Sequence, residues 1–117
     1  MQHAELSEGL WRKIMHQLTF YIPESHLNIV KNALFEKGAG KMGNYDCCCW
    51  QTKGEGQYRP LENSNPFLGE KNKISCEVEY KVEMICEDHL IDTVIETLLK
   101  THPYETPAFS AYPVRVK

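Results

Sequence analysis

The 117-residue sequence lacks the features that would place it in several common classes of protein. No apolar run approaches the roughly 20 residues that cross a bilayer. The N-terminal sequence, MQHAELSEGLWRKIMHQ, has none of the long apolar segment of a signal peptide. We therefore expect a cytoplasmic protein with no membrane partner. The 13 basic residues are scattered and the formal net charge is −3, which argues against a nucleic-acid partner.

Signatures of catalysis and of a disulfide framework are also absent. The sequence has no HExxH motif, no phosphate-binding Walker loop and no serine–histidine–aspartate order typical of a hydrolase. Three of the five cysteines are consecutive, and the total is odd, which suits reduced thiols better than disulfides. The length fits one domain with its own core.

Hydrophobic periodicity predicts two strand–helix units. Alternation over residues 18–22 predicts a strand, and apolar positions at helical spacing predict a helix over 25–38, with Ser25 as its N-cap. The same two patterns recur over 78–86 and then over 87–102, where a proline ends the second helix. Each helix is expected to bury one apolar stripe against the sheet.

Two more strands complete the predicted sheet. Residues 44–52, rich in tyrosine, cysteine and tryptophan, are predicted to form the second strand, and residues 108–116 the last strand. Residues 53–75 are expected to form a long loop, with or without short edge strands, and a loop of this length in a compact domain usually serves function or assembly. The order βαββαβ predicts an α+β, ferredoxin-like fold with two helices on one face of an antiparallel sheet.

The chain is expected to divide into an N-terminal extension, residues 1–17, and a ferredoxin-like domain, residues 18–117. Within the extension, residues 1–16 have the apolar spacing of an extra helix. The face of the sheet away from the helices is expected to meet solvent or a partner.

The middle of the chain is rich in glycine, and its first cluster carries a candidate ligand site. Gly38, Gly40 and Gly43 match the spacing of a dinucleotide-binding fingerprint. That fingerprint needs a strand before it and a helix after it, whereas here the order is reversed. A helix cap with a tight turn is the favoured interpretation. An anion site formed by Lys41 and backbone N–H groups is the alternative.

Two further motifs are weak candidates for a metal ion. In a strand, Cys47 and Cys49 would share a face, so they either pack as small apolar side chains or bind Cu(I). His102 and Glu105 lie in the sequence His-Pro-Tyr-Glu. They either bind a ligand or a divalent metal ion together, or form a rigid helix-to-strand corner with a bond between the imidazole and the carboxylate.

Many ordered motifs resemble the YqfO-type domain of the Nif-three-like family. They are Phe20–His26, Ala33–Phe35, Gly38–Gly40, Gly43–Tyr45, Cys49–Trp50, Gly54, Gly56, Arg59–Pro60, Ser64–Phe67, Gly69, Glu83–Met84 and His102–Glu105. This domain is similar in fold to CutA and PII proteins, which are trimers, so the resemblance implies a homo-oligomer, most simply a trimer. Longer family members carry two metal ions in flanking halves that have no counterpart here. The resemblance therefore implies the fold but not the metal site or the hydrolase or cyclohydrolase activity suggested for the family.

Three functions remain open at this point. The first is a non-catalytic regulatory or assembly module that binds a small ligand or metal ion between subunits, with the glycine cluster and the His102–Glu105 corner lining the cleft. The second is an accessory domain that docks on a dinuclear-metal hydrolase. The third is a CutA-like metal-tolerance protein that uses its cysteines.

Overall fold

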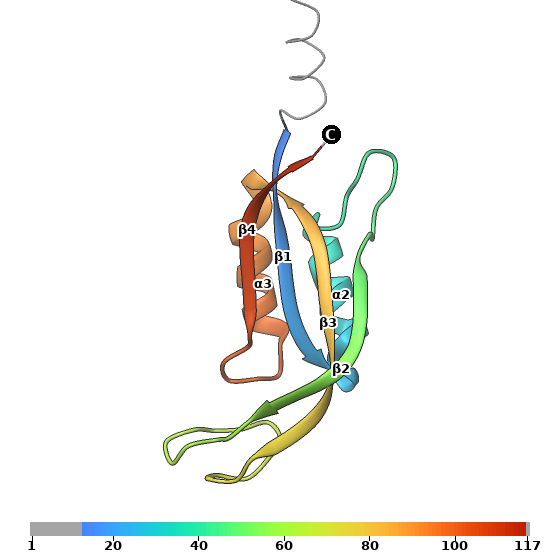
Figure 1. Ribbon diagram of the computed structural model, residues 1–117. Coiled ribbons are helices and arrows are strands. Elements are labelled where there is room, and N and C mark those ends of the chain that lie inside the picture. The colour runs from blue at the N-terminus through green and yellow to red at the C-terminus, as the bar shows by residue number, and fades with distance from the viewer. Residues whose placement is uncertain (1–12, 117) are drawn as a thin grey trace, which may run out of the picture.

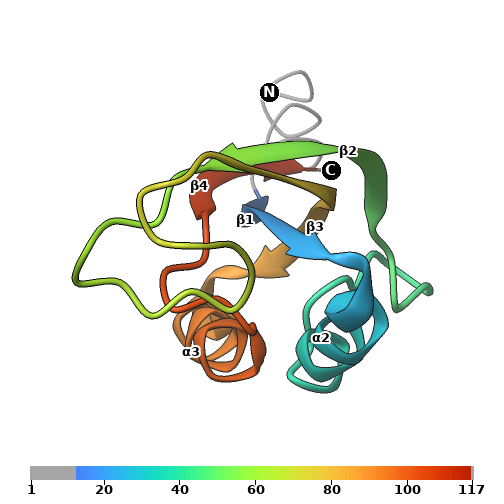
Figure 2. The same ribbon diagram turned by 90° about the horizontal axis from the view of Figure 1, so that it is seen from below.

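The computed structural model describes residues 13–116 as an antiparallel sheet with two helices on one face (Figures 1 and 2). The elements are β1 Lys13–Pro23, a 3-10 turn η1 Glu24–His26, α2 Leu27–Glu36, β2 Trp50–Tyr58, β3 Ser75–Glu87, a 3-10 turn η2 Asp88–Leu90, α3 Ile91–Thr101 and β4 Phe109–Val116. The strand order is β2-β3-β1-β4, with antiparallel neighbours throughout. The α+β, ferredoxin-like fold predicted from the sequence is confirmed. No helix within residues 13–116 has the length and apolar character needed to cross a membrane.

The core lies between the two helices and the central strands. It is formed by Leu18, Phe20 and Ile22 of β1, Val82, Met84 and Cys86 of β3, Leu27, Val30 and Leu34 of α2, and Ile91, Val94 and Leu98 of α3. These are the alternating strand positions and helical stripes that the sequence predicts. Burial, with Glu87 adjoining, raises the pKa of the Cys86 thiol to about 11, so this cysteine packs as a neutral, small apolar side chain.

The first two glycines of the glycine cluster have structural roles at the end of α2. The N–H of Gly38 donates to Phe35 O at 3.0 Å, and the N–H of Ala39 donates to Leu34 O at 3.2 Å. This is a Schellman motif, and Gly38 supplies its left-handed residue with φ of +98°. Gly40 then donates to Ile85 O at 2.7 Å and ties the turn to β3. The helix-cap interpretation of this cluster is confirmed.

The N-terminal boundary differs from the expectation. β1 begins at Lys13, five residues before the predicted strand, and pairs there with Val116 of β4. The expected helix over 1–16 is therefore wrong for residues 13–16, whose backbone is held in the sheet. Residues 1–12 lie outside the described part of the chain. The division into an extension and a domain after residue 17 stays a prediction.

The second strand is displaced toward the C-terminus. Residues 44–49 form no strand: Met42 and Tyr45 close a tight turn, and Cys47 has a positive φ of 54°. The prediction that Cys47 and Cys49 share a strand face is therefore wrong. Instead β2 covers Trp50–Tyr58, so the expected loop over 53–75 is shortened by a strand that pairs with β3.

The β2–β3 hairpin extends past the end of β1. β1 reaches β3 only as far as Glu79, whereas the pairing of β2 with β3 continues to Tyr58 and Ser75. We call residues 55–58 and 75–78 the arm. Figure 1 shows the arm projecting below the other strands.

The start of α2 differs from the expectation, whereas the end of α3 agrees with it. Ser25, the predicted N-cap, lies in the 3-10 turn before α2, and its Oγ lies 2.8 Å from Nδ1 of His26 rather than capping the helix. α3 ends at Thr101, and the proline at 103 follows the extended residue His102, as the sequence predicts.

Candidate functional site

The His-Pro-Tyr-Glu segment forms a rigid corner between α3 and β4. His102 is 6% exposed. Its Nδ1 accepts the N–H of Tyr104 at 3.1 Å, so Nε2 carries the proton that it donates to Tyr21 O at 2.6 Å. The predicted corner is present, but its partners are Tyr21 and Tyr104 in place of the expected Glu105.

The environment of His102 keeps its imidazole neutral. Burial lowers the pKa of His102, an effect that the bond to the Tyr21 carbonyl and the charge of Glu79 oppose and that His26 reinforces. Both ring nitrogens take part in hydrogen bonds, so the imidazole links the corner to β1.

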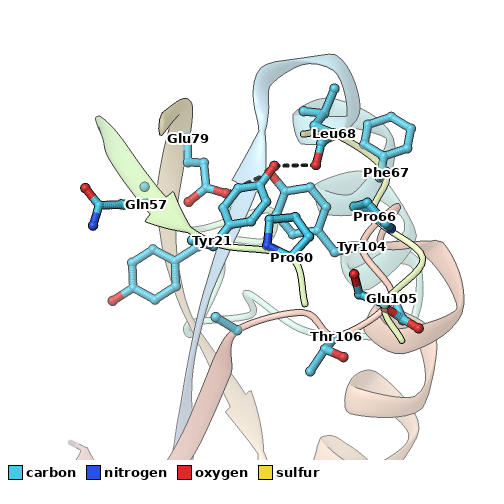
Figure 3. A pocket seen from close by; sticks show the side chains of 14 residues that line it. Tyr21, Gln57, Pro60, Pro66, Phe67, Leu68, Glu79, Tyr104, Glu105 and Thr106 are labelled. Atoms are coloured by element: carbon cyan, nitrogen blue, oxygen red, sulfur yellow. Dashed lines mark hydrogen bonds between the residues drawn. The ribbon is translucent and has the colours of Figure 1, made fainter. Parts of the chain in front are cut away.

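A pocket of about 350 Å³ lies beside this corner. It is lined by Tyr21, Gly56, Gln57, Tyr58, Pro60, Ser64, Pro66, Phe67, Leu68, Glu79, Tyr104, Glu105, Thr106 and Ala108. These residues come from β1, the arm, the loop after β2, β3 and the corner (Figure 3). The fold thus gathers aromatic rings and two carboxylates that are far apart in the sequence.

Hydrogen bonds fix the polar groups of the pocket. The Tyr104 hydroxyl donates to Glu79 Oε2 at 2.7 Å, and the Tyr58 hydroxyl donates to Leu68 O at 2.8 Å. Burial raises the pKa of both tyrosines, and for Tyr104 the bond to Glu79 raises it further. Glu105 Oε2 accepts the N–H of Asn65 at 3.0 Å and so anchors the loop after β2 to the corner.

Aromatic contacts build the walls of the pocket. The ring centroid of Tyr104 lies 4.9 Å from that of His102, 6.2 Å from that of Tyr58 and 6.3 Å from that of Phe67. Phe67 also meets His26 edge-on at 5.3 Å. Such tilted and edge-on pairs stabilise the wall beyond the area that they bury.

Gly56 makes room for one of the carboxylates. A Cβ at this position would overlap with Oε1 of Glu79. The strand glycine therefore marks a close approach of a side chain to the backbone of the arm.

The sequence-predicted glycines and the corner lie apart within one chain. Gly40 is hydrogen-bonded to Ile85 of β3, which pairs with Gln17 of β1. His102 is hydrogen-bonded to Tyr21, which lies four residues further along β1. Gly38 and Gly43 lie in the turns on either side of Gly40, and Lys41 is exposed beside it. The structure places Glu105 in the pocket, His102 directly behind its Tyr104 wall, and the glycine cluster outside it.

The cysteine candidates are not brought together with the histidine candidate. Cys47 is exposed, and Cys49 is half-buried at the edge of the core. Within residues 13–116 there is no group of three or more His, Cys, Asp or Glu side chains positioned for a metal ion. The predicted divalent-metal or Cu(I) site thus has no converging ligand set in this range.

Sequence reasoning missed most of the pocket. In the sequence, Tyr58 is an aromatic residue of the expected loop over 53–75, Phe67 belongs to the family motif Ser64–Phe67, and Glu79 is a charged residue of the strand predicted over 78–86. The usable signal was the dense aromatic content of the predicted loop together with the His-Pro-Tyr-Glu motif.

Comparison with known proteins identifies the relatives of this chain. No family model matches the sequence. A "GTP cyclohydrolase 1 type 2 homolog" of Halalkalibacterium halodurans is 36% identical over 100 residues, which are 86% of this chain and 27% of that protein. Its namesake in Listeria monocytogenes is 32% identical over 118 residues, which are 100% of this chain and 32% of that protein. The chain spans about a quarter to a third of the length of these curated relatives.

Solved structures with a similar fold include a relative of the same family. A Bacillus cereus protein related to NIF3 superposes with a TM-score of 0.74 and 29% identity, covering 87% of this chain and 26% of that one. CutA from Archaeoglobus fulgidus has a TM-score of 0.62 at 16% identity, covering 86% of this chain and 83% of its own. GlnK from B. subtilis has a TM-score of 0.59 at 13% identity, covering 87% and 86%; at these identities the likeness is one of fold. The chain therefore belongs to the Nif-three-like family, as its YqfO-type domain with a CutA- and PII-like fold.

Proposed function

We propose that this chain is a non-catalytic assembly module that associates with copies of itself through the open face of its sheet. The observation that carries the proposal is a set of large exposed side chains on that face. Tyr21 is 38% exposed, Tyr112 is 48% exposed and Trp50 is 69% exposed. An aromatic surface of this kind is typical of the core of a protein interface.

The strand register assigns these side chains to one face. Lys31 of α2 donates to Gln51 at 2.7 Å, so Gln51 lies on the helix side and its neighbour Trp50 on the other. Trp50 is opposite Glu83 on β3, which is opposite Thr19 on β1. On the central strands, by contrast, helix-side residues such as Phe20 and Val82 pack into the core.

Two of the charges at the centre of this face neutralise each other. Lys81 and Glu83 of β3 form an ion pair with Nζ and Oε1 3.2 Å apart. A neutralised, aromatic surface has a smaller desolvation cost on association than an unpaired charged surface.

The arm offers a second contact. A two-stranded ribbon is marginally stable by itself. Two apolar side chains are exposed here: Val78 of the arm is 50% exposed, and Ile74, the residue before the arm's second strand, is 64% exposed. Packing the arm against a second copy would cover both residues.

The resemblance to CutA and PII proteins supports a trimer as the assembled form. In that form the predicted ligand cleft, with Gly38, Gly40, Lys41 and Gly43 on one wall and the His102–Glu105 corner on the other, has to be formed by two different subunits. This follows because one chain holds the two groups apart.

The test is the mass of the purified chain by light scattering and native mass spectrometry. We expect a multiple of the 13.6 kDa chain, most simply three copies. Trp50→Arg and Tyr112→Arg are each expected to yield a folded monomer because they place a charge in the interface. Ile29→Arg is the matched control: Ile29 is 62% exposed on the helix side, so this variant should assemble normally.

A wild-type chain that stays monomeric at micromolar concentration would overturn the proposal. So would unchanged assembly of both open-face variants. The first result would favour the accessory-domain alternative, in which a different protein covers the same face.

A further inference from the structure

The pocket beside the corner shares Tyr21 with the open face, but its charge pattern points to a ligand of a different kind. Its two charged lining residues, Glu79 and Glu105, are both carboxylates. We propose that this pocket binds a small organic cation, with an ammonium, amidinium or guanidinium group on a flat apolar body, and that the two carboxylates supply the counter-charge.

The walls suit the apolar body and the cation together. Tyr58, Phe67 and Tyr104 present three rings whose neighbouring centroids lie 6.2 and 6.3 Å apart. A cation over an aromatic face is attracted by the ring quadrupole, and the attraction grows when the group is desolvated. In Figure 3, Glu79 lies on one side of the Tyr104 ring and Glu105 on the other.

The carboxylates are positioned before any ligand arrives. Tyr104 holds Glu79 through Oε2, and Gly56 leaves space for the carboxylate to lie against the arm. Asn65 holds Glu105 through its Oε2. The second oxygen, Oε1, accepts no hydrogen bond from residues 13–116 in either carboxylate, and that of Glu79 lies against Gly56.

An anionic ligand would be disfavoured at this position. None of the fourteen residues that line the pocket is lysine, arginine or histidine. A phosphate or carboxylate ligand would meet two negative charges in a partly apolar cavity, where repulsion is stronger than in water. A volume of about 350 Å³ lies at the lower end of the range for small-molecule sites, so the ligand is a single ring or a short chain.

The experiment compares three probes that share a ring and differ in charge: benzamidine, benzamide and benzoate. Binding to the full chain is measured by NMR titration. Benzamidine is expected to shift the signals of Glu79, Tyr104 and Glu105, and to bind at least tenfold more tightly than benzamide. Benzoate is expected not to bind. Because one chain supplies every lining residue, the monomeric Trp50→Arg variant should bind benzamidine equally well, which separates this proposal from self-association.

Two variants assign the effect to the pocket. Glu79→Gln keeps an acceptor for Tyr104 but removes the charge, and should weaken benzamidine binding roughly tenfold. Phe67→Leu keeps an apolar wall but removes the ring, and should weaken binding about threefold to tenfold. Glu96→Gln makes the same charge change on the outer surface of α3 and should leave binding unchanged.

Several results would overturn the proposal. They are equal binding of benzamidine and benzamide, tighter binding of benzoate, no binding of benzamidine at millimolar concentration, or no effect of Glu79→Gln. If Glu79→Gln instead weakens self-association, the pocket takes a basic side chain from a second copy and the small-molecule assignment is wrong.

Discussion

The two faces of the sheet are built from the same strands but differ in burial: the helices cover one face, and the other is exposed in the single chain. Phe20 and Tyr21 are neighbours on β1, yet Phe20 is fully buried under the helices and Tyr21 is 38% exposed on the other side. The helix-covered face is complete within one chain. The open face carries the exposed aromatic side chains that are typical of an interface, and no other element within residues 13–116 covers them. Packing of one face therefore accounts for folding, and the other face is the one for which we propose self-association.

The sharpest way to test this contrast is to truncate the two neighbours. Phe20→Ala is expected to lower the free energy of unfolding by about 3–5 kcal/mol, because it removes a large ring from a close-packed core. Tyr21→Ala removes a ring from the open face and should cost less than about 1 kcal/mol. Denaturant unfolding gives both values.

The comparison is made in the monomeric Trp50→Arg background, because assembly would stabilise the folded state by mass action. Equal losses for the two variants would mean that the open face already belongs to the core of a single chain.

The covered side also depends on how α2 is joined to the sheet. Gly40 has φ of +79°, and a Cβ there would lie 2.8 Å from Cys48 O and 2.9 Å from Phe35 Cε1. Gly40→Ala is expected to cost about 2–3 kcal/mol from strain and overlap.

Gly43 provides the matched control for this position. It also has a positive φ, of 58°, but a Cβ there meets open space, so Gly43→Ala should cost only about 1 kcal/mol. Thermal or denaturant unfolding of both variants measures the difference. Similar losses at the two sites would show that the close approach to Cys48 is relieved by local movement.

Sequence patterns predicted the covered face better than the rest, for a physical reason. The core positions of β1, β3 and both helices repeat at strand or helix spacing, and burial enforces that spacing. β2 carries mostly exposed residues, including Gly54 and Gly56, so no buried stripe marks its position. Its limits are set by register with β3, which is a tertiary property. The pocket is harder to predict from the sequence than β2, because Tyr58, Glu79 and Tyr104 come together only after the arm and the corner have folded.

The corner adds a titratable group to the covered side. The pKa of His102 is lowered in the folded protein from its ordinary value of about 6.5. The unfolded chain therefore takes up a proton first as the pH falls. Stability should be complete above about pH 6.5 and should be lost as the pH falls from there through the folded pKa. Protonation of Nδ1 would also break the bond from the Tyr104 N–H.

Denaturant unfolding measured as a function of pH tests this prediction. His102→Gln should lower stability at neutral pH by about 1–3 kcal/mol, because it disturbs the bonds to Tyr21 and Tyr104, and should flatten the acid-side slope. His89→Gln, at an exposed histidine, should leave the stability at neutral pH unchanged. A slope that persists in His102→Gln would assign the acid sensitivity to other groups.

The smallest expected effect lies on the open face and completes the contrast. Lys81 and Glu83 pair across 3.2 Å, but both side chains reach solvent, so their attraction is screened and offset by the entropy of ordering them. Lys81→Met should therefore leave the unfolding midpoint of the monomeric background unchanged within error. In the assembling chain the same substitution leaves Glu83 unpaired in a surface proposed to become buried, and association should weaken. Light scattering over a dilution series measures that loss. A change in monomer stability with no change in association would mean that the ion pair supports the fold and that this part of the face stays in solvent.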